Sequence, residues 1–174
     1  MRWFLLLPCL LVLAACDVAV SRRPLVVSGG EQPLPGLWAL LEPGCPQPSG
    51  GAVGSWSKCA TPVWVQPGEA TVVGSSPVRK VFVVGAGEPR ILQVETRTGE
   101  DEPVFSYWAL RTEGPLPSRS ATLWVVACEA DRGRTGAAVE DGECLVEDAA
   151  ELQRLARAAV SEEPVGRAAY IGPR

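Results

Sequence analysis

Short apolar segments alternate with clusters of Pro, Gly and acidic residues along most of this chain. They recur roughly every 10–15 residues, a pattern typical of strands in β-sandwiches and small barrels. Residues 91–98 alternate Leu92 and Val94 with Gln93 and Glu95, which predicts a strand with one solvent-facing side. The predicted strands are 36–41, 62–66, 69–73, 78–84, 91–98, 104–112 and 121–128, with a short last strand over 167–171.

One helix is predicted, over residues 148–160. Asp148 can cap its first turn, with Glu151 three residues later as a capping-box partner, and Pro164 ends it. An apolar stripe at helical spacing predicts a buried side, formed by Leu152, Leu155, Ala156 and Ala159. We expect this stripe to cover an open end or a face of the sheet.

The order of these segments predicts the fold class. Strands and helices do not alternate, so a parallel α/β fold is not expected. We predict a mainly β fold: one antiparallel sandwich or small barrel-like domain over residues 34–174, with one C-terminal helix. A chain of 174 residues is long enough to bury a hydrophobic core of its own.

The N-terminal segment predicts the protein's location. Arg2 precedes an apolar run that ends in Leu13-Ala14-Ala15-Cys16. This motif resembles the lipobox of bacterial lipoproteins, which implies cleavage before Cys16 and acylation of that cysteine. The protein would then be anchored in the inner or outer membrane of a bacterial cell envelope, facing the periplasm. Residues 1–15 would be the signal peptide and 16–33 a flexible lipidated tether, with a short strand near 25–27 as an option.

Two other interpretations of this segment stay open. One is an ordinary secretory signal in which Cys16 is incidental. The other is a transmembrane anchor, but the apolar stretch of about 13 residues is shorter than the roughly 20 that span a bilayer. Two or more acyl chains on Cys16 would give stable membrane attachment, whereas one chain would be marginal.

Four further cysteines would remain in the mature domain after signal cleavage and acylation. An even number in an exported chain indicates disulfides, and four cysteines allow three pairings. We predict the two local pairs, Cys45–Cys59 and Cys128–Cys144, which close short loops. Zinc is not expected, because the chain lacks histidine and closely spaced cysteine pairs.

Charge and chemistry argue against several functions. The net charge is −4 and no basic block occurs, so neither nucleic acid nor an anionic lipid surface is expected as an electrostatic partner. Without histidine no nucleophile–histidine–acid triad can form, and Lys58 and Lys80 are expected to be solvated surface charges. The acidic clusters 100–102 and 140–143 are expected to be solvated turns. Residues 85–87 lack the pattern of a phosphate-binding loop. We therefore expect no enzymatic activity and no cofactor.

Tryptophan offers the better lead to a function. It can fill a core, line a ligand pocket or anchor an interface, and the mature chain would contain Trp38, Trp56, Trp64, Trp108 and Trp124. Gly36-Leu37-Trp38 resembles the G-x-W of lipocalins and of small β-barrel protease-inhibitor lipoproteins, and this implies a barrel with an internal pocket.

Two function classes follow from these observations. The first is an envelope lipoprotein that acts as a structural or protein-interaction module, protease inhibition included. The alternative is a lipocalin-like carrier of a small apolar ligand.

Overall fold

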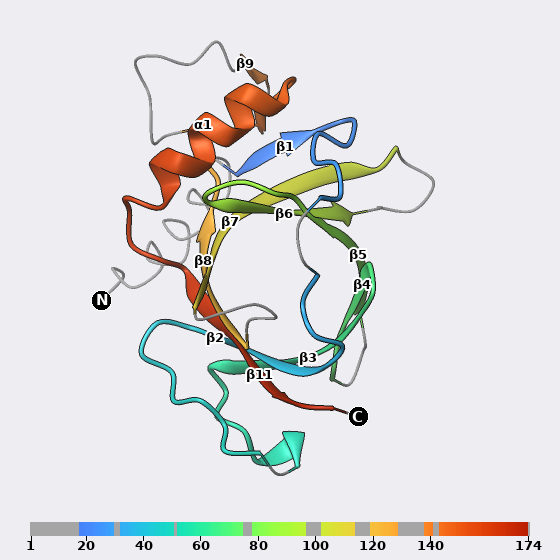
Figure 1. Cartoon of the computed structure of the whole chain (residues 1–174), viewed down its shortest axis with the longest axis vertical. Helices are drawn as coiled ribbons and strands as arrows, with labels where there is room; N and C mark the ends of the chain where they lie inside the picture. The colour runs from blue at the N-terminus through green and yellow to red at the C-terminus, as the bar shows by residue number, and fades with distance from the viewer. Residues whose placement is uncertain are drawn as a thin grey trace, which may run out of the picture.

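Eight antiparallel strands close into a barrel in the computed structural model of this chain (Figure 1). The structure describes residues 18–29, 32–50, 52–74, 78–96, 102–113, 119–128, 138–140 and 143–173. Around the barrel the strands are β2 (Gly36–Leu41), β3 (Ala60–Gln66), β4 (Glu69–Val72), β5 (Val78–Val84), β6 (Arg90–Thr96), β7 (Val104–Glu113), β8 (Ser120–Val125) and β11 (Gly166–Gly172). The predicted mainly β fold is confirmed, as a barrel rather than a sandwich.

The barrel closes where β11 pairs with both β8 and β2. Gly36, the first residue of β2, has φ +146°, and a Cβ built on it would lie 2.5 Å from the carbonyl oxygen of Gly172. A side chain at this position would therefore collide with the backbone of β11. Glycine permits both the backbone conformation and the close approach.

A three-stranded extension continues the sheet beyond β7. Strand β1 (Ala19–Ser21) pairs antiparallel with β7 and parallel with β10 (Glu143–Leu145), and β10 pairs with β9 (Ala138–Glu140). None of these three strands is predicted from the sequence. Each spans three residues, which is too short for a periodic pattern.

The expectation of a flexible spacer from residue 16 to 33 is wrong for the part that the structure describes. Ala19 and Ser21 are almost completely buried, so the domain begins near Val18 rather than near Leu34. Residues 25–27 are not a strand. Instead, the backbone N–H groups of Leu25 and Val26 donate to Oε1 of Gln93, at 2.9 and 3.0 Å.

The same contacts correct the prediction of a solvent-facing side for residues 91–98. Gln93 is 4% exposed because the segment before β2 covers it, and Ile91 next to it is 4% exposed. Leu92 and Val94 point to the opposite side, into the barrel. Both sides of β6 are therefore covered over its described core.

The single α-helix among the described residues, α1 (Ala149–Ala159), packs on the outside of the barrel wall (Figure 1). Asp148 Oδ1 accepts from the backbone N–H of Glu151 at 2.8 Å, which confirms the predicted cap. The Glu151 carboxylate instead lies 3.7 Å from the Arg154 guanidinium. All four residues of the predicted stripe are buried, so the helix covers a face of the sheet rather than an end of the barrel.

Most of the fully buried side chains belong to the core between this helix and the barrel wall. This outer core joins the buried stripe of α1 to outward-facing residues of β6, β7 and β8, including Ile91, Phe105, Tyr107 and Trp124. A second, smaller outer cluster forms where Ala39, Leu41 and Ala169 pack beneath the loop between β2 and β3, which contains the short 3-10 helix Val53–Ser55.

Both predicted disulfides are present. Cys45 is bonded to Cys59 with a Cα–Cα distance of 5.8 Å, and Cys128 is bonded to Cys144 with a distance of 5.7 Å. Such bonds are typical of proteins exported from the reducing cytosol. Cys16 lies outside the described residues. Within those residues no helix has the length and hydropathy required to cross a membrane.

Candidate functional site: the barrel interior

The barrel encloses a cavity of about 380 Å³. Successive residues of a strand point to opposite sides of a sheet, so every second residue of the barrel strands faces this space. The apolar side chains that line it are Pro33, Trp38, Leu40, Val63, Val65, Ala70, Val72, Phe82, Val84, Leu92, Val94, Trp108, Leu110, Ala121, Leu123 and Ala168.

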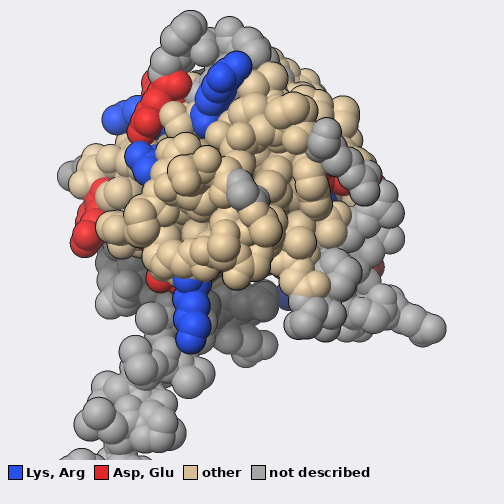
Figure 2. Space-filling view, turned by 90° about the horizontal axis from the view of Figure 1, so that it is seen from below, with Lys and Arg blue, Asp and Glu red and all other residues tan. Residues whose placement is uncertain are grey.

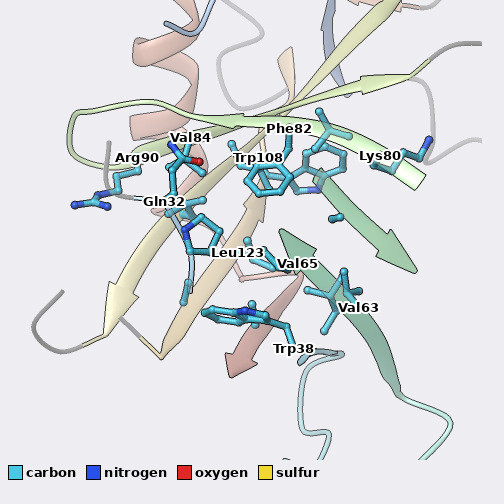
Figure 3. A pocket seen from close by; sticks show the side chains of 18 of the residues that line it. Gln32, Trp38, Val63, Val65, Lys80, Phe82, Val84, Arg90, Trp108 and Leu123 are labelled. Atoms are coloured by element: carbon cyan, nitrogen blue, oxygen red, sulfur yellow. The ribbon is translucent and has the colours of Figure 1, made fainter. Parts of the chain in front are cut away.

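Two tryptophans contribute aromatic surface to the cavity wall. Trp38 packs edge-to-face against Tyr170, with ring centroids 5.5 Å apart, and its Nε1 donates to the carbonyl oxygen of Leu34 at 2.8 Å. The polar group of this indole is thus satisfied outside the cavity, and its ring is left for apolar contact. Trp108 of β7 borders the same space from another part of the wall (Figure 3).

Polar side chains are few in the lining. They belong to Gln32, Lys80, Arg90, Thr112 and Ser120, although the Ser120 hydroxyl group donates to Glu113, which is not part of the lining. The described lining contains no carboxylate. Figure 3 shows Arg90 and Lys80 on different sides of the cavity, with their nitrogen-bearing ends directed away from its centre. Long cationic side chains commonly expose the charged end while their methylene groups cover apolar surface. The interior is therefore apolar in its body, with positive charge at its margins.

The other three tryptophans of the mature chain lie outside the cavity. Trp124 is in the outer core, where its Nε1 donates to the carbonyl oxygen of Glu162 and Arg111 lies over its ring at 5.8 Å. Trp56 packs near the Cys45–Cys59 disulfide, and Trp64 points outward from β3, between two residues that face the cavity. Core-filling and pocket-lining roles are thus divided among these residues.

The predicted candidates for chemistry are dispersed. Lys58 is exposed, as expected, but Lys80 lines the cavity and is not a fully solvated surface charge. Of the two acidic clusters, Glu100, Asp101 and Asp141 lie outside the described residues. Glu102 is exposed, and Glu140 and Glu143 belong to β9 and β10. Residues 85–87 form part of the β5–β6 connection. Across the described part of the chain, no three Cys, Asp or Glu residues gather as metal ligands would.

A buried polar contact supports the wall next to the cavity. The hydroxyl groups of Ser21 and Tyr107 are hydrogen-bonded, and Tyr107 has no exposed surface. Burial raises the pKa of Tyr107, although its hydrogen bonds to Ser21 and to the backbone of Leu25 act in the opposite direction. This contact holds β1 on the outside of the barrel and leaves the interior free of it.

Gln32 and Arg90 are cavity residues that were not predicted from the sequence. The alternation along residues 90–94 places Arg90 on the same side as Leu92 and Val94, and this signal could have identified it. Gln32 belongs to a segment without periodicity, so no comparable signal exists for it. Comparison with protein-family models, with curated proteins and with solved structures finds no match to this chain.

Proposed function

We infer that the protein binds a small apolar ligand inside its barrel. The observation that carries this proposal is the cavity of about 380 Å³ with a nearly continuous apolar lining. Ligand pockets of proteins commonly have volumes of about 300–1,000 Å³ and combine an apolar lining with a few polar groups. A binding role of this kind requires no catalytic group and no cofactor.

The distribution of buried residues supports the proposal. Residues with no exposed surface, such as Leu155, Tyr107 and Val126, belong to the outer core and not to the barrel interior. The domain thus has a packed core that is separate from the cavity. Packing in protein interiors normally leaves few voids larger than a water molecule. An interior left open in a domain with another core is more typical of a binding site than of a structural element.

The lipobox adds a location to this function. We propose that Cys16 is acylated and holds the barrel at a membrane of the bacterial cell envelope. Ala19 is buried in β1 only three residues later, so the link reaches at most roughly 11 Å, given about 3.6 Å per extended residue. The barrel would sit close to the bilayer surface, and a ligand taken from or delivered to that surface would have a short path.

Native mass spectrometry of the domain after purification from its own host tests the binding function. The expected result is additional mass that is lost on denaturation. Binding of an uncharged apolar fluorophore, N-phenyl-1-naphthylamine, to the emptied domain provides a second measurement. A domain that carries no additional mass and binds no apolar probe would contradict the proposal.

A pair of variants tests the location of the ligand. Ala168→Phe places a large ring in the cavity and should abolish fluorophore binding. Val81→Phe adds the same side chain on the outside of the barrel, where Val81 is 44% exposed, and should leave binding unchanged. Equal binding by the two variants would place the probe elsewhere. Thermal unfolding of both variants verifies that they fold.

Protein interaction is a second candidate, favoured by one surface. Between Glu42 and Glu69 the sequence contains a single charged residue, Lys58. Figure 2 views the molecule from the side of the β2–β3 loop and shows a broad uncharged surface with Lys, Arg, Asp and Glu mainly near its edges. Charge depletion of this kind is typical of the centre of an interface.

The two candidates respond to different substitutions. Ser49 and Ser55 are exposed in this loop, and replacing both with Glu adds charge there without touching the cavity. For a protein-interaction module, this double variant should lose retention of envelope proteins on the immobilised domain while fluorophore binding stays intact. Unchanged retention by the double variant would count against an interface on this surface.

A further inference from the structure

Four of the five polar residues in the described cavity lining lie at one end of the barrel. Arg90 is the first residue of β6, Thr112 is next to the last residue of β7, Ser120 is the first residue of β8, and Gln32 lies four residues before β2 begins. In an antiparallel barrel the start of one strand and the end of the next lie at the same end. These four residues therefore share one end, which we call the Arg90 end.

The chain crosses this end on its way into the barrel wall. Residues 32–35 lead to Gly36 and pass across the barrel in Figure 1. Gln32 and Pro33 of this segment contribute to the cavity lining. A cation, an amide and a hydroxyl group therefore lie at the same end of an apolar space.

Lys80, the other cation of the lining, has a different setting. It is the third residue of β5, a strand that runs toward the Arg90 end and reaches it only at Val84. Its register partner is Ala70, and the next inward residues are Phe82 and Val72, all apolar. The described lining residues beside Lys80 are therefore apolar.

Two acidic residues near the Arg90 end have their contacts on the outside of the barrel. Glu88 pairs with Arg111 at 3.5 Å, and Glu113 accepts hydrogen bonds from the hydroxyl groups of Ser120 and Thr122. Neither Glu88 nor Glu113 contributes to the cavity lining. An anion at the inner side of this end would thus share that end with Arg90, Gln32 and Thr112, and the described lining contributes no carboxylate there.

We propose that the cavity takes a single-chain amphiphile with an anionic head group, such as a long-chain carboxylate. The hydrocarbon chain occupies the apolar body of the barrel, and the head group lies at the Arg90 end, where its oxygen atoms meet the guanidinium group. Arginine remains charged at all relevant pH values and can donate two parallel hydrogen bonds to a carboxylate. This inference rests on the proposed function, because it needs the interior to be a ligand site.

The test compares one chain length with two head groups. All described elements lie from Val18 onward, so binding of dodecanoate and of dodecan-1-ol is measured by calorimetry with residues 17–174 in the absence of detergent. Dodecanoate is expected to bind about tenfold more tightly than the alcohol, because charge-assisted hydrogen bonds are stronger than neutral ones. Arg90→Gln should remove this preference, so that the carboxylate and the alcohol bind with similar affinity to the variant.

Arg111→Gln is the matched control. Arg111 is adjacent in sequence to Leu110, the register partner of Arg90, but points outward, so its replacement removes the same charge from the same end without touching the cavity. It should preserve the preference for dodecanoate.

The outcomes separate the inference from the function on which it rests. If neither compound binds, the proposed function fails. If both bind equally, or if Lys80→Gln rather than Arg90→Gln removes the preference, the apolar site stands and the anionic head group at the Arg90 end is wrong. If Arg111→Gln removes the preference as fully as Arg90→Gln, the effect is a general one of charge, and this head-group site is also wrong.

Discussion

The domain has a packed outer core and an open interior. The same Leu→Ala substitution should therefore lower the free energy of unfolding by different amounts in these two places. Leu155 of α1 has no exposed surface and packs in the outer core, whereas Leu92 of β6 is only partly buried and lines the cavity. Leu→Ala at a packed site removes apolar contacts and leaves a new cavity, at a cost of about 3–5 kcal/mol. We expect Leu155→Ala to fall in this range.

The cost at Leu92 should be smaller, because the space beside it is already empty. Truncation there enlarges an existing cavity and mainly loses the transfer free energy of partly buried methylene groups, about 1–2 kcal/mol at about 0.8 kcal/mol per fully buried group. Urea unfolding of the ligand-free domain, followed by tryptophan fluorescence, measures both changes in the free energy of unfolding. An equal loss for the two variants would mean that the barrel interior is packed as tightly as the outer core, and this would refute the reasoning.

Further predictions concern the anchor, the barrel seam, the helix cap and a buried hydroxyl group. Cys16→Ser should release the protein from membranes or leave its precursor uncleaved, and unchanged processing and detergent partitioning would contradict acylation. Gly36→Ala should destabilise the seam by about 2 kcal/mol or more, because its Cβ meets the β11 backbone at a positive φ. Asp148→Ala should lower the free energy of unfolding by only about 1 kcal/mol. Urea unfolding measures the losses for Gly36→Ala and Asp148→Ala. Because burial raises the pKa of Tyr107, its contribution to stability is complete below the unfolded pKa of about 10 and declines as the pH rises through the folded value. Tyr107→Phe should weaken this alkaline dependence, and an unchanged pH profile would refute the assignment.

Much of the barrel could be predicted from local pattern. Each predicted strand that became part of the wall was found within three residues of its expected ends, because period-two alternation and Pro or Gly residues mark such segments. The helix was found with its cap and all four buried positions, since a 3.6-residue period and a capping residue are local signals. The disulfides also joined the cysteines that are nearest in the chain.

The docking of the segment before β2 could not be predicted in the same way. Residues 18–29 contain Arg22, Arg23 and Pro24, which suggested an exposed spacer, and their contacts are made with residues far along the chain. The Ser21 hydroxyl group is hydrogen-bonded to that of Tyr107, and the backbone N–H groups of Leu25 and Val26 donate to the side chain of Gln93. A buried glutamine that accepts two backbone hydrogen bonds has the same appearance in a sequence as one that faces solvent.

The cavity is a different case, because its residues were identified as strand residues but its volume was not. An apolar residue on the inward side of a strand gives the same signal whether it fills a core or borders an empty space. An eight-stranded barrel is just wide enough for its side chains to fill it or for one small ligand to occupy it, so the sizes of the inward residues decide between these states. Here Ala70, Ala121 and Ala168 take inward positions, and the last two are directly paired across β8 and β11. Small residues on adjacent strands leave room that the large side chains of Trp38, Phe82 and Trp108 border but do not fill, so the open interior follows from side-chain size once eight strands close the barrel.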